Sequence, residues 1–247
     1  MTAVSVALLS LPASAAVERP EFAPTIGASV AAATELTDDA GQSRTLGQWL
    51  EGKPAVVIFG YHNCPNLCGV VQQTVARALG ATGLAPASHQ TLFISLAPVE
   101  GPTDAAAAKV RLAEAVGDAT AAPWRFLSGT DVVPLAESFG LGAIERERIR
   151  QYVHPVALFT LTPSAHISHV LPGLEIGAGD LRLAIVDASA GRIGTLFDRI
   201  ILFCAGFDPT KGQHTPFVLS ALRTAAIATL IVTLLAIGWL RLRERRQ

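Results

Sequence analysis

The sequence has few charged residues, and the two signs nearly cancel. Charged residues make up 16% of the 247 positions, and the formal net charge is −1. Proteins that bind nucleic acid carry a basic patch or stripe, and this composition supplies no excess of lysine and arginine for one. We therefore expect no nucleic acid partner. Half of the residues are hydrophobic, and this excess is concentrated at the two ends of the chain.

Cysteine is scarce, with three residues in the whole chain. Cys64 and Cys68 lie four positions apart in the stretch IFGYHNCPNLCG. Cys204 is far from them, and we expect it to be a lone buried or membrane-proximal thiol. The chain therefore offers one closely spaced pair of thiols, and its function depends on which other residues that pair uses.

Lysine and arginine are missing before the apolar segment that opens the chain. Residues 4–11 form this short segment, and residues 12–15 follow with the small-residue A-x-A pattern that signal peptidase reads. We expect a signal peptide over residues 1–15, cleaved after Ala15, although the basic start typical of such peptides is absent.

Charge is also missing from residues 224–240, TAAIATLIVTLLAIGWL. A membrane-spanning helix needs about 20 apolar residues, with a range of about 17 to 25. Residues 217–222 extend the run, and Arg223 can reach the interface with its long side chain. We expect a transmembrane helix over residues 217–240, followed by a cytoplasmic basic tail over residues 241–247.

Together the two ends predict a single-pass protein of the cell membrane. Its globular domain would lie on the outer, periplasmic side, and its C-terminus would be cytoplasmic. The membrane is then itself a partner. The outer compartment is oxidising, so free thiols there need a reason.

The body of the chain reads as alternating strands and helices. We expect a lead-in segment over residues 16–50, a thioredoxin-like domain over 51–190 and a connector over 191–216. This order gives the α/β fold class, a thioredoxin-like sandwich with a C-terminal transmembrane helix. The predicted strands are 55–60, 91–98, 124–129 and a hairpin over 155–173, and the predicted helices are 70–79, 103–117, 131–140 and 178–189.

The thiol pair follows an apolar strand and precedes a helix. A helix N-terminus carries partial positive charge, which favours thiolate over thiol and lowers the pKa of a cysteine. Pro65 suits the first helical turn, and a spacing of four leaves both sulfurs near one face of a helical turn. The two thiols can then hold a metal ion or form a reversible disulfide. Two structural cysteines are the plainer alternative.

Two thiolates do not complete the four ligands of zinc, but they suit Cu(I). A nearby imidazole would also allow Cu(II). Among the six histidines, His154 stands at a junction between a loop and the apolar strand that begins after Pro155, and in a thioredoxin-like domain this junction lies beside the cysteine loop. Among the other histidines, His62 lies on the cysteine loop as a group that supports a ligand or is solvated, and His89 is expected at the surface. His166 and His169 lie in the hairpin and His214 lies near the expected anchor.

Three stretches resemble the Sco/SenC copper-chaperone family of thioredoxin-like cytochrome c oxidase assembly proteins. VVIFGYHNCPNLCG is similar to its F-G-[YF]-T-x-C-P-D-x-C-P motif, WRFLSGT to its tryptophan-bearing strand, and YVHPVALFTLTPSAHISHVLPG to the segment with its copper-binding histidine. The resemblance spans about residues 24–190. It implies that copper, as Cu(I) or Cu(II), is bound by Cys64, Cys68 and His154.

Three residues depart from the family's pattern. Asn66 replaces an acidic residue, Gly69 replaces a proline, and Ala97 replaces the aspartate of a Ser-[ILV]-Asp-Pro stretch. These changes remove negative charge near the site without touching the ligands. Most members also have an N-terminal anchor, so the expected C-terminal anchor indicates a divergent branch.

The resemblance implies a membrane-anchored accessory protein that binds copper and helps assemble the copper centre of cytochrome c oxidase. Its partner would be a subunit of the oxidase or another copper-handling protein. The alternative is an enzyme, a thiol–disulfide oxidoreductase in which Cys64 and Cys68 reduce a partner's cysteines. His154 distinguishes the two, because copper needs a third ligand and thiol exchange does not. A peroxidase is a weaker alternative, since such a site needs an arginine and the cysteine loop has none.

Overall fold

The computed structural model describes most of the body of the chain. The described residues are 20–65, 67–146, 151–172, 174, 176–193, 207–208, 213–214, 224, 226–230, 233, 239 and 241. The expected signal peptide, Cys204, most of the connector, most of the expected transmembrane helix and nearly all of the basic tail lie outside them. Within the described part, no helix has the length and apolar character needed to cross a membrane.

A five-stranded sheet with the order β5-β4-β3-β8-β9 forms the centre of the domain. The three strands β3, β4 and β5 are parallel, whereas β8 runs antiparallel to β3 and β9 runs antiparallel to β8. The thioredoxin-like arrangement expected from the sequence is thus present. The strands are β3 Ala55–Gly60, β4 Gln90–Ser95, β5 Trp124–Leu127, β8 Ala157–Leu161 and β9 Ile167–Pro172.

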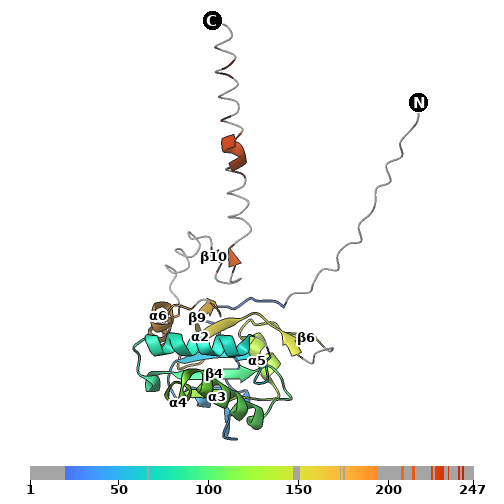
Figure 1. Cartoon of the computed structure of the whole chain (residues 1–247), viewed down its shortest axis with the longest axis vertical. Helices are drawn as coiled ribbons and strands as arrows, with labels where there is room; N and C mark the ends of the chain where they lie inside the picture. Colours follow the sequence, from blue (N-terminus) through green and yellow to red (C-terminus); the bar gives the residue numbers. More distant parts are fainter. Residues whose placement is uncertain are drawn as a thin grey trace, which may run out of the picture.

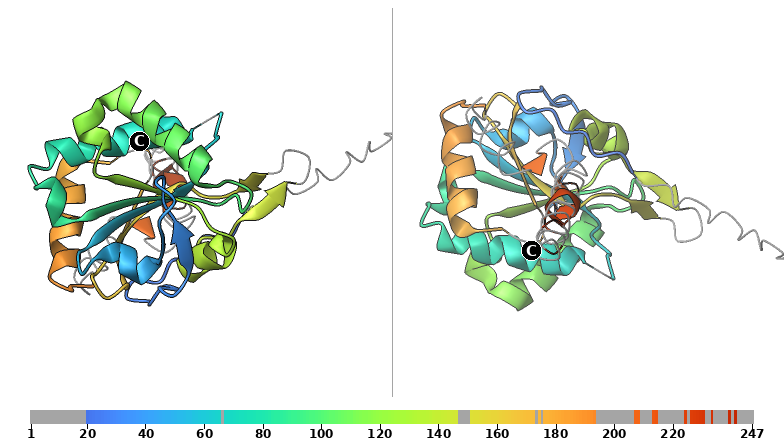
Figure 2. Two further views of the ribbon diagram at one scale, coloured as in Figure 1. Left: turned by 90° about the horizontal axis from the view of Figure 1, so that it is seen from below. Right: turned by 90° about the horizontal axis from the view of Figure 1, so that it is seen from above.

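Helices cover both faces of this sheet (Figures 1 and 2). Side chains alternate along β3, so Val56 and Ile58 pack under α2, α3 and α6, while Val57 and Phe59 pack under α1 and α5. Every residue of β3 is buried, which explains its unbroken apolar sequence. The helices are α1 Leu46–Leu50, α2 Cys68–Ala81, α3 Pro102–Val116, α4 Asp118–Ala121, α5 Val132–Ser138 and α6 Ala178–Ser189, with the 3₁₀ turn η1 at Pro86–Ser88.

Residues 20–50, which we expected to lead into the domain, belong to it. They form the antiparallel pair β1 Glu35–Thr37 and β2 Ser43–Thr45, and then α1, which the Thr45 side chain caps. Leu36 and Trp49 are about 99% buried in the core beneath the sheet. The boundary expected at residue 51 therefore falls inside the folded unit.

The remaining predicted elements match with small shifts. The helix predicted over 178–189 has the bounds of α6, and the predicted hairpin is β8–β9. The helix predicted over 103–117 is α3, but its N-cap is Gly101 and not Thr103, because Asp104 accepts the Gly101 N–H at 2.9 Å. Two small antiparallel pairs were not predicted: β6 Ile144–Arg146 with β7 Gln151–Val153, and β10 Phe207–Asp208 with β11 Gln213–His214.

Candidate functional site

The loop that carries the cysteines joins β3 to α2, and we call residues 61–67 the thiol loop. It leaves the sheet at Gly60, where backbone and side chains are tightly packed. A Cβ atom on Gly60 would lie 2.7 Å from Phe93 Cζ and 3.3 Å from Cys68 Sγ. Glycine at the strand end thus lets the second thiol lie directly against the sheet.

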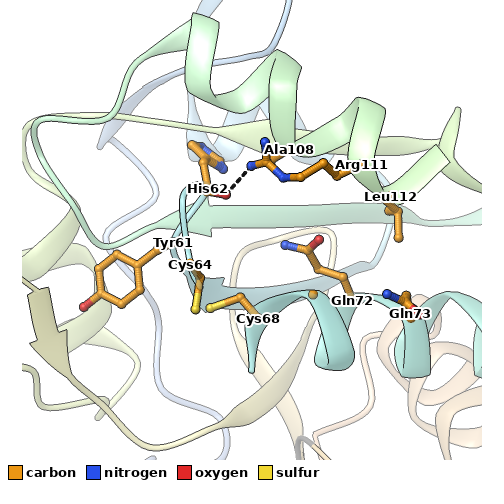
Figure 3. Close-up of a pocket in the computed structure, with 10 residues that line it drawn as sticks. Tyr61, His62, Cys64, Cys68, Gln72, Gln73, Ala108, Arg111 and Leu112 are labelled. Carbon is orange, nitrogen blue, oxygen red and sulfur yellow. Dashed lines mark hydrogen bonds between the residues drawn. The ribbon is translucent and has the colours of Figure 1, made fainter. Parts of the chain in front are cut away.

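Cys64 and Cys68 lie beside each other (Figure 3). A hydrogen bond joins their side chains. Cys68 is the first residue of α2, whereas Cys64 precedes the helix and Pro65 lies in a bend. The two sulfurs therefore meet because the loop folds back, and not because they share a face of one helical turn as expected. Both thiols are free and half-buried.

The electrostatics of Cys68 differ from the expectation. Burial raises the pKa of the Cys68 thiol to about 12, and the hydrogen bond with Cys64 and the charge of Glu100 act in the same direction. A backbone hydrogen bond at Tyr61 lowers this pKa but does not compensate. The expected lowering by the helix N-terminus is thus wrong for Cys68, because desolvation of the charged form outweighs the helix dipole.

Side chains of α3 and of the loop between β4 and α3 form hydrogen bonds with the main chain of the thiol loop. The Glu100 carboxylate accepts the main-chain N–H of His62 at 2.7 Å and that of Asn63 at 2.8 Å. It also accepts the hydroxyl of the buried Ser95. From α3, Arg111 donates to the His62 carbonyl at 2.6 Å, as Figure 3 shows.

The His62 side chain is turned into the core and is not beside the thiols. Its ring packs against those of Phe93 and Phe126, which also pack against each other, and its Nε2 is 3.0 Å from Ser128 Oγ. Burial lowers the pKa of His62, although the charge of Glu100 opposes this. We therefore assign His62 a structural role. The sequence placed it on the loop, either supporting a ligand or solvated, and its burial contradicts the solvated alternative.

His154 lies on the same side of the molecule as the thiol pair. A cavity of about 260 Å³ is lined by Cys64, Cys68 and His154, together with apolar side chains such as Val153 and Val156. Thus β7 and the segment after it bring the histidine over the thiol loop, as the sequence predicted.

The state of the His154 imidazole suits a metal ligand. Its Nδ1 lies 2.9 Å from the Pro155 carbonyl oxygen, so Nδ1 carries the proton and the lone pair is left on Nε2. Burial lowers the pKa of His154, which keeps the ring neutral at pH 7. A neutral imidazole with its other nitrogen held by a carbonyl is the usual form of a metal-binding histidine.

The other histidines do not reach this cavity. His89 precedes β4, at the end of the parallel strands opposite to the thiol loop. His166 contacts Ser164 in the β8–β9 turn, and His169 faces Asp187 of α6 at 3.6 Å. His166 and His169 thus lie in the hairpin as expected, whereas the surface position expected for His89 is wrong, because His89 is buried.

The donor set of two thiols and one neutral imidazole suits a soft metal such as copper. Within the described part of the chain, however, no three histidine, cysteine or acidic side chains are grouped so that they hold a metal ion. The structure thus pairs the two thiols and places His154 on the wall of their cavity. The assignment of all three as ligands stays a prediction.

A second cavity of about 190 Å³ opens on the other side of the thiol pair, between α2 and α3. Its wall contains polar groups, the buried Gln72 and the Arg111 guanidinium (Figure 3). Sequence reasoning missed both Arg111 and Glu100. Glu100 follows β4, and the C-terminal ends of β4 and β3 lie side by side, so its position after a buried strand was an available signal.

The chain was compared with protein families and with known proteins. Residues 23–141 match the family model SCO1/SenC, a range that includes both cysteines of the pair and ends before His154. No curated protein matches the sequence significantly.

Solved structures with the same fold cover about two thirds of the chain. Arabidopsis thaliana ScoI with copper bound is 17% identical, with a TM-score of 0.51, covering 68% of this chain and 99% of its own. Bradyrhizobium japonicum ScoI with copper bound is 20% identical, with a TM-score of 0.50, covering 67% and 99%. BsSco, a member of the Sco family of cytochrome c oxidase assembly proteins, is 15% identical, with a TM-score of 0.52, covering 70% and 98%.

At these identities the solved structures show the fold alone, and the likeness to a family rests on the sequence match. That match begins at residue 23, within the segment that packs into the core, and it contains the strand, the loop and the helix that together present the thiol pair. Residues 23–141, which carry the thiol pair, are therefore similar to the SCO1/SenC family.

Proposed function

We propose that this protein binds copper through Cys64 and Cys68, with His154 as the third ligand, and helps assemble the copper centre of cytochrome c oxidase. Copper is here a cargo to be handed on. The observation that carries the proposal is the cavity that two adjacent thiols line together with a neutral imidazole. Similar proteins support it too, because the two ScoI structures contain copper and BsSco belongs to the Sco family of cytochrome c oxidase assembly proteins.

The raised pKa of Cys68 fits a site that captures a metal and does not act as a fast nucleophile. A thiol with a pKa of about 12 is protonated at pH 7, so it attacks disulfides slowly. A metal ion supplies the positive charge that the cavity lacks and displaces the proton as it binds.

His154→Ala tests the proposal. The variant should lose Cu(II) affinity by about 100-fold or more, because loss of a group that merely supports a ligand already costs about 10- to 100-fold. Cu(I) affinity should fall less, since two thiolates can still hold Cu(I). Titration of the reduced protein with Cu(II), read by the thiolate-to-copper charge-transfer absorption, and competition with a Cu(I) chelator measure the two affinities.

His166→Ala is the matched control, because His166 is half-buried at the other end of β8 and contacts Ser164. It should bind both copper states as the unaltered protein does. If His154→Ala also binds both states normally, the copper site lacks its third ligand, and the thiol–disulfide alternative becomes the better description.

The hydrogen-bonded thiol pair also favours that alternative function, a thiol–disulfide oxidoreductase. In that case Cys64 and Cys68 should cycle between dithiol and disulfide while a partner's cysteines are reduced. Mass spectrometry of the oxidised protein should show Cys64 linked to Cys68. A Cys64–Cys204 bond as the main species would argue against both functions.

We further propose that a helix over residues 217–240 anchors the protein, with the domain on the periplasmic side and residues 241–247 in the cytoplasm. The uncharged run and the four arginines that follow it support this topology. A reporter that is active only in the cytoplasm, fused after Gln247, should be active. Activity of a reporter that works only outside would reverse the topology.

A further inference from the structure

A single carboxylate organises the start of the thiol loop. Glu100 receives hydrogen bonds from two consecutive main-chain N–H groups, those of His62 and Asn63, and from the Ser95 hydroxyl. Ser95 is fully buried at the end of β4, so it fixes the carboxylate to the sheet. The carboxylate thus ties the thiol loop to the strand next to the one that the loop leaves.

These contacts lie directly before Cys64. Asn63 is its neighbour, and the Asn63 side chain is held in addition by Asp104 at 2.7 Å. On the other side of Cys64, the Leu67 carbonyl accepts the Val71 N–H at 2.9 Å, and Cys68 opens α2. The position of one thiol is therefore set by Glu100 and that of the other by the helix, and their separation depends on both.

A negative charge is present near the thiol pair, although the differences from the Sco/SenC motifs were expected to remove it. Ala97 stands where the family's pattern has an aspartate, yet Glu100, three residues later, places a carboxylate under the loop. Charge-assisted hydrogen bonds from N–H groups to a carboxylate are about twice as strong as neutral ones. A carboxylate with several donors is therefore a strong tie.

We propose that Glu100 is a positioning residue of the thiol pair, which holds the His62–Asn63 main chain so that Cys64 Sγ stays beside Cys68 Sγ. The inference deepens the proposed function, because the same pair is the proposed copper site. It is tested without copper. If the protein fails to bind copper, the proposed role of Glu100 is unaffected. If Glu100 proves not to position the thiols, the copper proposal is likewise unaffected.

The test is the equilibrium of the Cys64–Cys68 pair with dithiothreitol, measured on the full-length, metal-free protein in detergent. A Cys204→Ser background leaves one pair of thiols. In the exchange, the protein disulfide is reduced to two thiols while dithiothreitol is oxidised to its cyclic disulfide. Glu100→Gln keeps the shape of the side chain but offers one acceptor oxygen to three donors, and its amide N–H groups would face other donors.

We expect Glu100→Gln and Glu100→Ala to shift this equilibrium towards the dithiol by about tenfold or more, which corresponds to about 30 mV. The reason is that a loose loop lowers the effective concentration of one thiol at the other. Glu35→Gln is the matched control. Glu35 lines the same open cavity as Glu100, and no hydrogen bond joins its side chain to the described residues of the thiol loop. Its equilibrium should stay within twofold of the unaltered protein.

An equilibrium within twofold for both Glu100 variants would overturn the proposal. If either variant loses its circular dichroism signal and is unfolded, hydrogen exchange in the unaltered protein decides instead. The amide protons of His62 and Asn63 should exchange slowly, because Glu100 accepts both. Exchange of these two amides at the rate of an unstructured peptide would equally refute the role of Glu100.

Discussion

The clearest test of the packing around the thiol pair is Gly60→Ala. The new Cβ would lie 2.7 Å from Phe93 Cζ, closer than a Cβ atom approaches another atom in folded proteins, and 3.1 Å from Phe93 Cε2, which is also tight. Phe93 cannot swing away, because it is fully buried and its ring packs against Phe126 at 5.4 Å and His62 at 5.8 Å between centroids. The sheet or the thiol loop must therefore move.

Overpacking of this kind costs about 1 to 3 kcal/mol of unfolding free energy. We expect Gly60→Ala to fall within that range in urea unfolding of the reduced protein. The same methyl group would lie 3.3 Å from Cys68 Sγ. The variant should therefore also disturb the thiol pair, seen as a changed rate of disulfide formation.

Gly80→Ala provides the comparison, since Gly80 lies in α2 and a Cβ there meets nothing within 4 Å. It should stabilise the protein by up to about 1 kcal/mol, because alanine is the better helix former. A loss of less than about 0.5 kcal/mol in Gly60→Ala would fall in the range of ordinary surface substitutions. It would show that the strand end is not packed as described, and the reasoning would fail.

Two further predictions concern a thiol and the domain boundary. The rate of alkylation of Cys68 in the metal-free protein should be low at pH 7, because only the thiolate reacts. This rate should rise about tenfold per pH unit until the pH reaches the pKa of about 12. A rate that no longer rises above pH 9 would contradict the burial of this thiol. A chain that begins at residue 51 should fail to give a cooperative thermal transition, whereas one that begins at residue 20 should give one, because Leu46, Trp49 and Leu50 are buried in the core. Equal transitions from both would show that residues 20–50 contribute little.

Local sequence patterns were sufficient for the elements whose formation depends on their own residues. The apolar run of β3 and the span of α6 could be read directly. Burial on both faces of a sheet leaves an unbroken apolar run, and burial on one face of a helix leaves a periodic pattern. The thiol pair could be placed at a turn from strand to helix for the same reason. The resemblance to the Sco/SenC family rested on these same stretches, and the family match includes the cysteines.

Only the tertiary structure decided what surrounds the thiols. Glu100 and Arg111 are remote from Cys64 in sequence, and they reach the loop because β4 and α3 pack beside it. The pKa of Cys68 depends on how deeply the fold buries the thiol, which no local pattern records, so the helix N-terminus alone gave the wrong sign.

The membership of residues 20–50 in the core was likewise hidden in the sequence. Val30, Leu36 and Trp49 stand in a stretch without clear periodicity, and their burial arises from contact with a sheet formed later in the chain. Sequence by itself thus determined which strand and helix carry the two thiols. The depth of their burial and the residues that hold them were decided by the tertiary structure, because both depend on contacts between segments that are far apart in the chain.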